Sequence, residues 1–203
     1  MTPRVSIITT VWDRVDCLRR CLRSVQHLAF QDFEQIVVSD CPEPDVLDQI
    51  ELLVTAAGPK VRHLNMAERT NNWGIGPAEV GLRFARGEYV CFLSDDNAYL
   101  PNHFAPLVAA LDADPGLGFA YSSCLYAARK VLAFDPPVGA GIDLGQPLFR
   151  RSVLPERMPK CVMSWDWELI HSLMEQGVRW QHIPDATFVF RLEVYPQFME
   201  ALA

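Results

Sequence analysis

The segment Glu88–Pro101, EYVCFLSDDNAYLP, decides how the rest of the chain is interpreted. Its apolar run Tyr89–Leu93 is typical of a strand that is buried on both faces. The run ends in two adjacent carboxylates, Asp95 and Asp96, and Pro101 closes the loop that follows. Two acids at the end of a buried strand repel each other, so they favour a divalent cation or a shared hydrogen-bond network. A polar turn that caps the next helix is the alternative that this segment leaves open.

Strands and helices alternate three times before residue 70. Apolar runs predict strands at residues 5–10, 36–38 and 61–64, and apolar side chains at helical spacing predict helices after the first two. This alternation predicts an α/β fold with a parallel sheet and helices on both faces. Right-handed crossovers then place every strand's carboxyl end on one rim, so Thr10, Asp40 and the Asp95–Asp96 pair should converge there.

The second half of the chain continues the pattern less regularly. A polar loop at residues 68–76 precedes a predicted helix, and another helix is expected around residues 104–111. Further expected elements are strands at 119–126 and 131–134, a Gly- and Pro-rich loop at 135–146, a helix from about 165 to 177, and short strands at 178–183 and 187–190. Because no linker separates two cores, we expect a single domain over residues 1–203.

Composition limits the classes of function. The 203 residues are 50% hydrophobic and carry a net charge of −7, which argues against a nucleic-acid-binding surface and against anionic membranes. The sequence has no apolar segment of about 18 residues and no signal peptide, so we expect a cytoplasmic protein without a transmembrane segment. The cysteines form no zinc set, and we expect reduced thiols in or near the core. They are Cys17, Cys21, Cys41, Cys91, Cys124 and Cys161.

Five features follow one another along the chain in a recognisable order. They are the VSIITT strand, the acid Asp40, the helix entry Asn72-Trp73-Gly74, the block RGEYVCFLSDDNAYLPN, and the late acid Asp166 at the start of a helix. Together, from Arg4 to about Arg191, they resemble the inverting nucleotide-sugar glycosyltransferases of family 2. The resemblance implies a GT-A-type, Rossmann-like domain with a mostly parallel central sheet. Residues 1–97 would then form a nucleotide-binding half, and residues 98–203 an acceptor-side half.

The resemblance also implies how a nucleotide is held. Thr10 and Trp12 follow the first strand, where such enzymes hold the base, and a flat indole can stack on uracil or thymine. Asp40 is similar in position to an acid that accepts the pyrimidine N3–H. Arg69 falls in the loop that the family uses near the base and the diphosphate, although a solvated loop arginine is the alternative.

The acids after the buried strand resemble the family's metal motif. Asp95 is expected to contact the ribose or sugar hydroxyls, and Asp96 to ligate Mn²⁺ or Mg²⁺ across the diphosphate. Asp166 is the expected general base, because inverting transfer needs a carboxylate on the face opposite the leaving diphosphate. Glu168 is its rival, but two residues further along a helix it should point away from Asp166. The alternative for Asp166 is a helix cap.

The acceptor side is less defined. Asp143, Trp165 and Trp167 are candidate acceptor residues, because they lie in or beside late loops and tryptophans stack on sugar faces. Alternatively, Asp143 caps a loop and the tryptophans belong to the core. The sequence also departs from the resemblance, since acids common near Ser94 and Asn97 are missing.

The expected function is therefore a non-processive, metal-dependent, inverting transfer of a sugar from a UDP- or dTDP-sugar to a hydroxyl acceptor, a saccharide or small molecule. One alternative is a nucleotidyltransferase, although that class carries a glycine-rich loop where residues 10–14 contain no glycine. Another is a non-catalytic nucleotide-sugar-binding module, which the helix residues Ala78-Glu79-Val80, in place of a common Arg-Asn pair, and the short segment after Asp166 favour. The sequence does not indicate the sugar, the acceptor or the oligomeric state.

Overall fold

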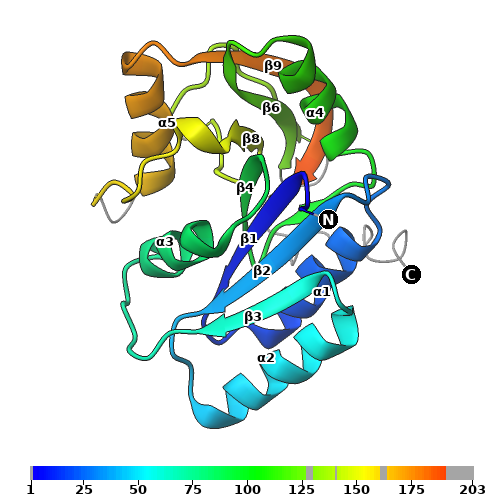
Figure 1. Cartoon of the computed structure of the whole chain (residues 1–203), viewed down its shortest axis with the longest axis vertical. Coiled ribbons are helices and arrows are strands. Elements are labelled where there is room, and N and C mark those ends of the chain that lie inside the picture. The colour runs from blue at the N-terminus through cyan, green and yellow to red at the C-terminus, as the bar shows by residue number, and fades with distance from the viewer. Residues whose placement is uncertain (1, 127–129, 140, 161–163, 191–203) are drawn as a thin grey trace.

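The computed structural model describes residues 2–126, 130–139, 141–160 and 164–190 (Figure 1). Within these ranges the strands form one sheet of nine strands, in the order β3-β2-β1-β4-β8-β6-β9-β5, with β7 paired to β6. The cartoon shows helices on both sides of this sheet. The α/β architecture predicted from the sequence is confirmed.

The parallel half of the sheet follows the predicted alternation. Its strands are β1 (Val5–Val11), β2 (Phe33–Ser39), β3 (Val61–Asn65) and β4 (Tyr89–Ser94). The helices that connect them are α1 (Val15–Gln26), α2 (Pro44–Ala57) and α3 (Ile75–Phe84). Thr10 of β1 is opposite Ser94 of β4, and Val11 is opposite Ser39 of β2. The acids that follow Ser39 and Ser94 are therefore brought to the same edge of the sheet.

Alternate residues of each strand enter different cores. Ile7 and Cys91 pack with α1 and α4, whereas their neighbours Ile8 and Phe92 pack with α3 and α5. Successive side chains of a strand point to opposite faces of the sheet, which explains the division. The apolar runs of β1 and β4 are continuous because both faces are covered.

The second half of the chain departs from a purely parallel arrangement. Its elements are β5 (Ala98–Tyr99), α4 (Phe104–Ala113), β6 (Leu117–Tyr126), β7 (Lys130–Leu132), β8 (Pro147–Arg150), the short 3₁₀ helix η1 (Arg151–Val153), α5 (Trp165–Glu175) and β9 (Arg179–Val189). β8 is antiparallel to β4 and β6, β7 is antiparallel to β6, and β5 is antiparallel to β9. The prediction that every strand ends on one rim is therefore wrong for β5, β7 and β8. For β7 the reason is that three residues after β6 are too few for a parallel crossover.

The last strand also differs from its prediction. The sequence predicts two short strands at 178–183 and 187–190, but β9 is one strand that runs parallel to β6. Its pairing moves from Ile183 opposite Ser122 to Ala186 opposite Ser123, so Pro184 and Asp185 lie in a bulge. A bulge accommodates a proline because the proline has no N–H to donate to the ladder.

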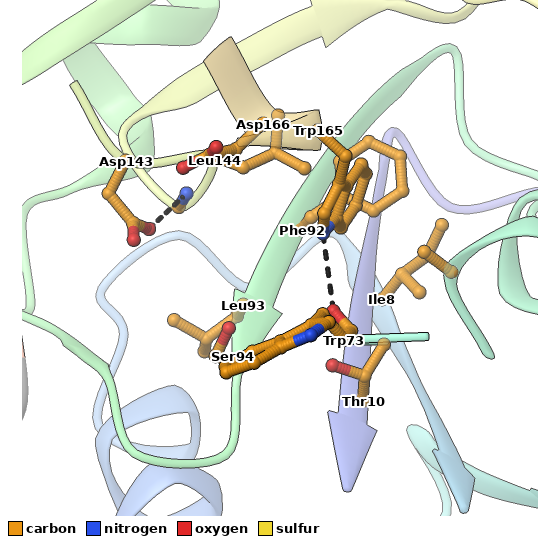
Figure 2. Close-up of a pocket in the computed structure, with 12 residues that line it drawn as sticks. Ile8, Thr10, Trp73, Phe92, Leu93, Ser94, Asp143, Leu144, Trp165 and Asp166 are labelled. Atoms are coloured by element: carbon orange, nitrogen blue, oxygen red, sulfur yellow. Dashed lines mark hydrogen bonds between the residues drawn. The ribbon is translucent and has the colours of Figure 1, made fainter. Parts of the chain in front are cut away.

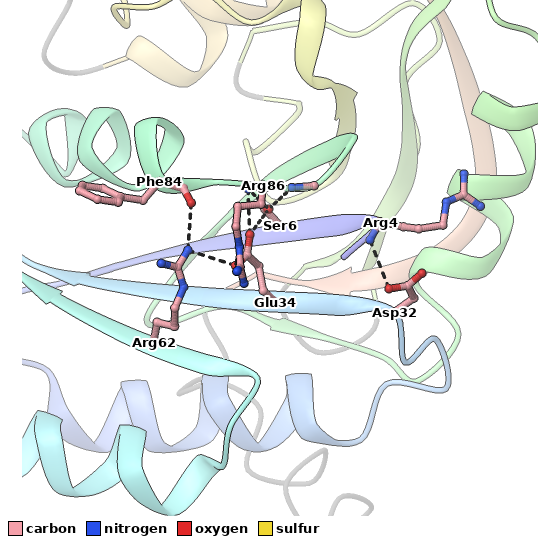
Figure 3. Close-up of polar contacts among 8 residues, drawn as sticks. Arg4, Ser6, Asp32, Glu34, Arg62, Phe84 and Arg86 are labelled. Atoms are coloured by element: carbon pink, nitrogen blue, oxygen red, sulfur yellow. Dashed lines mark hydrogen bonds and ion pairs between the residues drawn. The ribbon is translucent and has the colours of Figure 1, made fainter. Parts of the chain in front are cut away.

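A buried carboxylate joins the other end of the parallel strands. Glu34 is 3% exposed, and it accepts hydrogen bonds from the Ser6 hydroxyl at 2.8 Å, from the Arg86 backbone at 2.8 Å, and from the Arg86 and Arg62 guanidiniums at 2.7 and 3.0 Å (Figure 3). Burial alone would raise its pKa, but the bonds from Arg86 and Ser6 and the charge of Arg62 lower the pKa below the ordinary value. The cluster fixes the turn that leads from α3 into β4.

We expect Glu34→Gln to lower the Tm by about 5 °C at neutral pH, because the charged hydrogen bonds to two arginines weaken. Since the pKa of Glu34 is lowered in the folded protein, its contribution is present above the ordinary value of 4.5 and is lost as the pH falls below it. The Tm difference should therefore shrink in acid. Thermal melts between pH 3.5 and 8 measure it, with the exposed Glu51→Gln as the control. An unchanged Tm in Glu34→Gln would contradict the prediction.

Two sequence expectations concern the thiols and the membrane. Cys17, Cys21, Cys41, Cys91 and Cys124 are thiols that form no disulfide bond, and Cys21, Cys91 and Cys124 are buried. Cys161 lies outside the described residues. Among the helices that the structure describes, none has the length and apolar character needed to cross a bilayer.

Candidate functional site

A cleft of about 630 Å³ opens where β1, β2 and β4 end. It brings together eight of the residues singled out in the sequence, although they come from every part of the chain. They are Thr10, Trp12, Asp40, Arg69, Asp95, Asp96, Asp143 and Asp166. The aligned ends of the parallel strands account for Thr10, Asp40, Asp95 and Asp96, as predicted from the crossovers.

A smaller cavity of about 150 Å³ adjoins the cleft and shares Thr10, Trp73, Ser94, Asp143 and Asp166 with it. Figure 2 shows Asp143 and Asp166 on one side of this cavity and Thr10 and Ser94 on the other. Trp165 lines the smaller cavity only. The acids of the second half of the chain thus face the strand ends of the first half.

The two acids after β4 are held by an arginine that the sequence analysis did not single out. Arg14, in the loop between β1 and α1, bonds Asp95 Oδ2 through Nε at 3.2 Å and Asp96 Oδ2 through Nη1 at 2.6 Å, and its Nη2 bonds Asp95 Oδ1. Asp95 is 2% exposed. Burial raises the pKa of Asp95 to about 7, although the guanidinium of Arg14 opposes the rise. The acid pair therefore depends on a nearby positive charge to stay ionised.

Asp40 organises the loop that follows β3. One of its oxygens accepts hydrogen bonds from the Thr70 backbone at 2.8 Å and the Thr70 hydroxyl at 2.9 Å, and the other accepts one from the Asn71 backbone at 3.1 Å. A carboxylate has about four acceptor positions, so one position on the second oxygen accepts no hydrogen bond from the described residues, and Asp40 lines the cleft. Asp40 fits both the loop-capping role and the base-binding role.

Trp12 and Arg69 form a stacked pair at the wall of the cleft. The guanidinium carbon of Arg69 lies 3.3 Å from the centre of the Trp12 ring. Arg69 is exposed and also stacks on the indole, and a cation over an aromatic face is stabilising. One face of Trp12 is covered by Arg69, so a base would stack on the other face or against the guanidinium plane.

Asp166 lies in the first turn of α5. It lines both cavities, whereas Glu168 lines neither. Its Oδ1 accepts the backbone N–H of Trp167 at 2.8 Å, and burial raises the pKa of Asp166 above the ordinary value. This placement is consistent with the prediction that Glu168 points away from Asp166 around the helix axis.

The acceptor-side candidates divide into two groups. Asp143 faces the cavities and also accepts the Gly145 backbone N–H at 2.8 Å, which is the loop-capping contact considered as its alternative. Trp165 donates from its indole N–H to the Trp73 carbonyl at 3.2 Å (Figure 2). Trp167 lines neither cavity, because its ring packs beside His171 and against the core under α5. The structure thus supports the core alternative for Trp167.

Trp73 is a second cleft residue that sequence reasoning missed. Its side chain is 73% exposed, and its backbone is left-handed with φ of 58°, between Asn71 at 48° and Gly74 at 86°. A left-handed conformation is strained for a bulky residue. At Gly74 a side chain would add strain and would lie 3.2 Å from the Thr10 hydroxyl. The Asn72-Trp73-Gly74 motif therefore keeps the helix entry close to the end of β1 and presents an indole at the junction of the cavities.

The donor atoms at Asp95 and Asp96 suit a hard divalent cation. Carboxylate oxygens are the ligands that Mg²⁺ and Mn²⁺ prefer. In the part of the chain that the structure describes, no group of three or more His, Cys, Asp or Glu side chains is arranged to hold a metal. Two carboxylates in an open cleft fit a cation that completes its coordination with phosphate and water oxygens.

A family model described as "Glycosyl transferase family 2" matches residues 6–128, more than half of the chain. Among curated proteins, the putative colanic acid biosynthesis glycosyl transferase WcaA of Escherichia coli K12 is 22% identical over 179 residues, which are 87% of this chain and 62% of WcaA. A GalNAc(5)-diNAcBac-PP-undecaprenol beta-1,3-glucosyltransferase of Campylobacter jejuni is 29% identical over 126 residues, 61% of this chain and 38% of that protein. The chain spans less than two thirds of the length of these relatives.

Solved structures show the same fold. Residues 1–349 of S. aureus TarS in complex with UDP superpose with a TM-score of 0.72 at 17% identity, over 98% of this chain and 64% of that one. The mannosyltransferase PcManGT of Pyrobaculum calidifontis, in complex with GDP-Man and Mn²⁺, gives a TM-score of 0.76 at 19% identity, over 95% of this chain and 58% of that one. At these identities the likeness establishes the fold alone.

Proposed function

Because the chain belongs to glycosyl transferase family 2 and has the GT-A fold expected from its sequence, we propose that it transfers a sugar from a nucleotide-sugar donor to a hydroxyl acceptor with inversion. The observation that carries the proposal is the cleft in which Asp95 and Asp96 lie at the end of β4 and Asp166 lies at the start of α5. Such an arrangement supplies carboxylates to both the leaving-group side and the acceptor side of one in-line displacement.

The nucleotide would occupy the wall formed by Thr10, Trp12, Asp40 and Arg69. The open acceptor position of Asp40 suits the N3–H of a pyrimidine, and the Trp12–Arg69 stack offers flat surfaces for the base. UDP or dTDP donors follow from this assignment. Among the structural neighbours, TarS is solved with UDP and PcManGT with GDP-Man, so the choice of base depends on these residues and not on the fold.

The cation would be held by Asp96, with Asp95 beside it toward the ribose and sugar hydroxyls. A bound Mn²⁺ or Mg²⁺ supplies positive charge that stabilises the departing nucleoside diphosphate. Asp95 is 2% exposed, so its buried carboxylate would fix the orientation of the Asp95–Asp96 pair. The buried amide of Asn97, which lies 3.4 Å from Asp143 Oδ1, links this loop to the acceptor side.

Asp166 would take the proton from the acceptor hydroxyl as that oxygen attacks the anomeric carbon. Partial burial raises the pKa of Asp166, which makes it a stronger base than an exposed aspartate. Trp165 and Asp143 would line the acceptor side, and the exposed indole of Trp73 would stack on a sugar ring. The acceptor is then a saccharide or another small hydroxyl compound.

Turnover of a panel of UDP- and dTDP-sugars with mixed saccharide acceptors tests the proposal. Release of UDP that requires both Mn²⁺ and an acceptor is the expected result. A parallel assay supplies UTP or dTTP with a sugar 1-phosphate, and release of pyrophosphate in that assay would indicate a nucleotidyltransferase. Binding of donor without turnover in any combination would indicate a binding module. We also propose that residues up to about 97 form a nucleotide-binding half and that residues from about 98 form an acceptor-side half. The cytoplasmic location stays a prediction from the sequence.

Base preference gives a separate prediction. We expect UDP to bind at least about tenfold more tightly than GDP or ADP, because a purine leaves the open position of Asp40 unmatched. Asp40→Asn should reduce this preference. Competition binding measures both, and the melting temperature of the variant controls for loss of the Thr70 and Asn71 contacts. Equal affinities for the three nucleotides in the wild-type protein would refute the assignment.

A further inference from the structure

The Arg14 guanidinium occupies the position where a cation would contact the acid pair. Three of the four carboxylate oxygens of Asp95 and Asp96 accept hydrogen bonds from it. The Arg14 side chain is 48% exposed, whereas those of Asp95 and Asp96 are 2% and 13% exposed. The guanidinium therefore lies over the acids on the side that opens to the cleft.

This contact has a physical reason. Two adjacent carboxylates, one of them almost fully buried, repel each other unless a positive charge lies between them. Of the other described arginines, Arg69 also lines the cleft, but it stacks on Trp12 and bonds Asn71 at 3.4 Å. Among the described residues, Arg14 is thus the group whose charge opposes the repulsion within the pair, and it holds both carboxylates in place.

The same contact opposes a free cation. A divalent ion on these oxygens would have to share them with a guanidinium at bonding distance, and two positive charges so close repel each other strongly in a partly dry site. A cation can enter only if Arg14 moves to another anion. A diphosphate supplies one, because a guanidinium donates two parallel hydrogen bonds to phosphate oxygens.

We propose that Arg14 is an exchangeable counter-ion, which holds Asp95 and Asp96 in the nucleotide-free protein and transfers to the diphosphate when a cation and a nucleoside diphosphate bind together. The inference rests on the proposed function, since it takes the cleft as the diphosphate site. Arg14, like Trp73, lies outside the set of site residues expected from the sequence. It contacts the diphosphate without taking part in proton transfer.

The exchange makes cation and nucleotide binding cooperative. The cation alone must displace Arg14 without compensation, whereas the cation with UDP gives Arg14 a new partner. By linkage, Mn²⁺ strengthens UDP binding by the same factor by which UDP strengthens Mn²⁺ binding. A static Arg14, by contrast, would affect each affinity through its charge, but the coupling factor between Mn²⁺ and UDP would be the same with and without its side chain.

The test measures Mn²⁺ binding by electron paramagnetic resonance and UDP binding by calorimetry, each alone and together, in the wild-type protein and in Arg14→Ala. We expect Arg14→Ala to bind Mn²⁺ alone about tenfold more tightly and to bind UDP in the presence of Mn²⁺ about tenfold more weakly, so that the coupling factor collapses. Arg14→Gln, which keeps part of the side-chain volume, replaces Arg14→Ala if the alanine variant does not fold. Arg19→Ala is the matched control, because Arg19 is an exposed arginine of α1 that pairs only with Asp16 among the described residues; it should behave as wild type.

The two hypotheses fail in different ways. If the wild-type protein binds Mn²⁺ and UDP together and Arg14→Ala shows unchanged or weaker affinity for Mn²⁺ alone, the counter-ion role is overturned and the proposed function stands. If the wild-type protein shows no Mn²⁺-dependent UDP binding, the proposed function fails and the exchange fails with it.

Discussion

Asp166→Asn is expected to lower kcat by at least about 10²-fold while UDP affinity in the presence of Mn²⁺ and the Tm stay at wild-type values. Asparagine keeps the size of the side chain and can still accept the Trp167 N–H that Asp166 accepts at 2.8 Å. It cannot take a proton from the acceptor hydroxyl. The loss should therefore fall on the chemical step and not on donor binding, which single-turnover kinetics and calorimetry separate.

Glu168→Gln is the matched control, because Glu168 lies in the same turn of α5 but lines neither cavity. It should keep near-normal turnover. If activity is instead retained in Asp166→Asn and lost in Glu168→Gln, the base is Glu168. Loss of UDP binding in Asp166→Asn would point to a structural role for the carboxylate.

The pH profile adds a second measurement. A general base acts only when ionised, and burial raises the pKa of Asp166. Activity should therefore decline on acidification at a higher pH than an exposed aspartate would give, and Asp166→Asn should lose that limb. Because burial also raises the pKa of Asp95, to about 7, UDP binding must be measured at the same pH values, so that weaker donor binding is not mistaken for protonation of the base.

Sequence patterns predicted the first half of the fold well because its signals are local. Continuous apolar runs mark β1, β2 and β4, and β1 and β2 are each followed by a helix with regular apolar spacing. β8 was missed because Pro147–Arg150 is only four residues long and lies next to a Gly- and Pro-rich loop. The continuity of β9 was missed because Pro184 is a breaker in isolation, and only the pairing with β6 turns it into a bulge.

The sequence predicted the acids of the site but not the arginine that contacts them. Asp40, Asp95 and Asp166 could be placed from motif order, and the structure brings them to one cleft. Arg14 could not, since a loop arginine is usually solvated, and nothing local says that it reaches acids more than 80 positions later in the sequence. Yet the signal existed in physical terms, because two adjacent carboxylates, one of them buried, favour a nearby positive charge, and Arg14 follows shortly after the end of the neighbouring strand β1.

Asp96→Ala is expected to abolish the effect of Mn²⁺ on UDP binding. In the wild-type protein we expect Mn²⁺ to raise UDP affinity about tenfold or more, because Asp96 and the diphosphate together complete the oxygen ligands of the cation. Asp95 cannot hold the ion alone when Asp96 is removed, because only 2% of its surface is exposed. Calorimetry with and without Mn²⁺ measures the effect, and the Tm confirms folding. Asp16→Ala, an exposed acid of α1 that pairs with Arg19, is the control. An undiminished Mn²⁺ effect in Asp96→Ala would remove Asp96 from the metal site and would leave Asp95 as the carboxylate to test next.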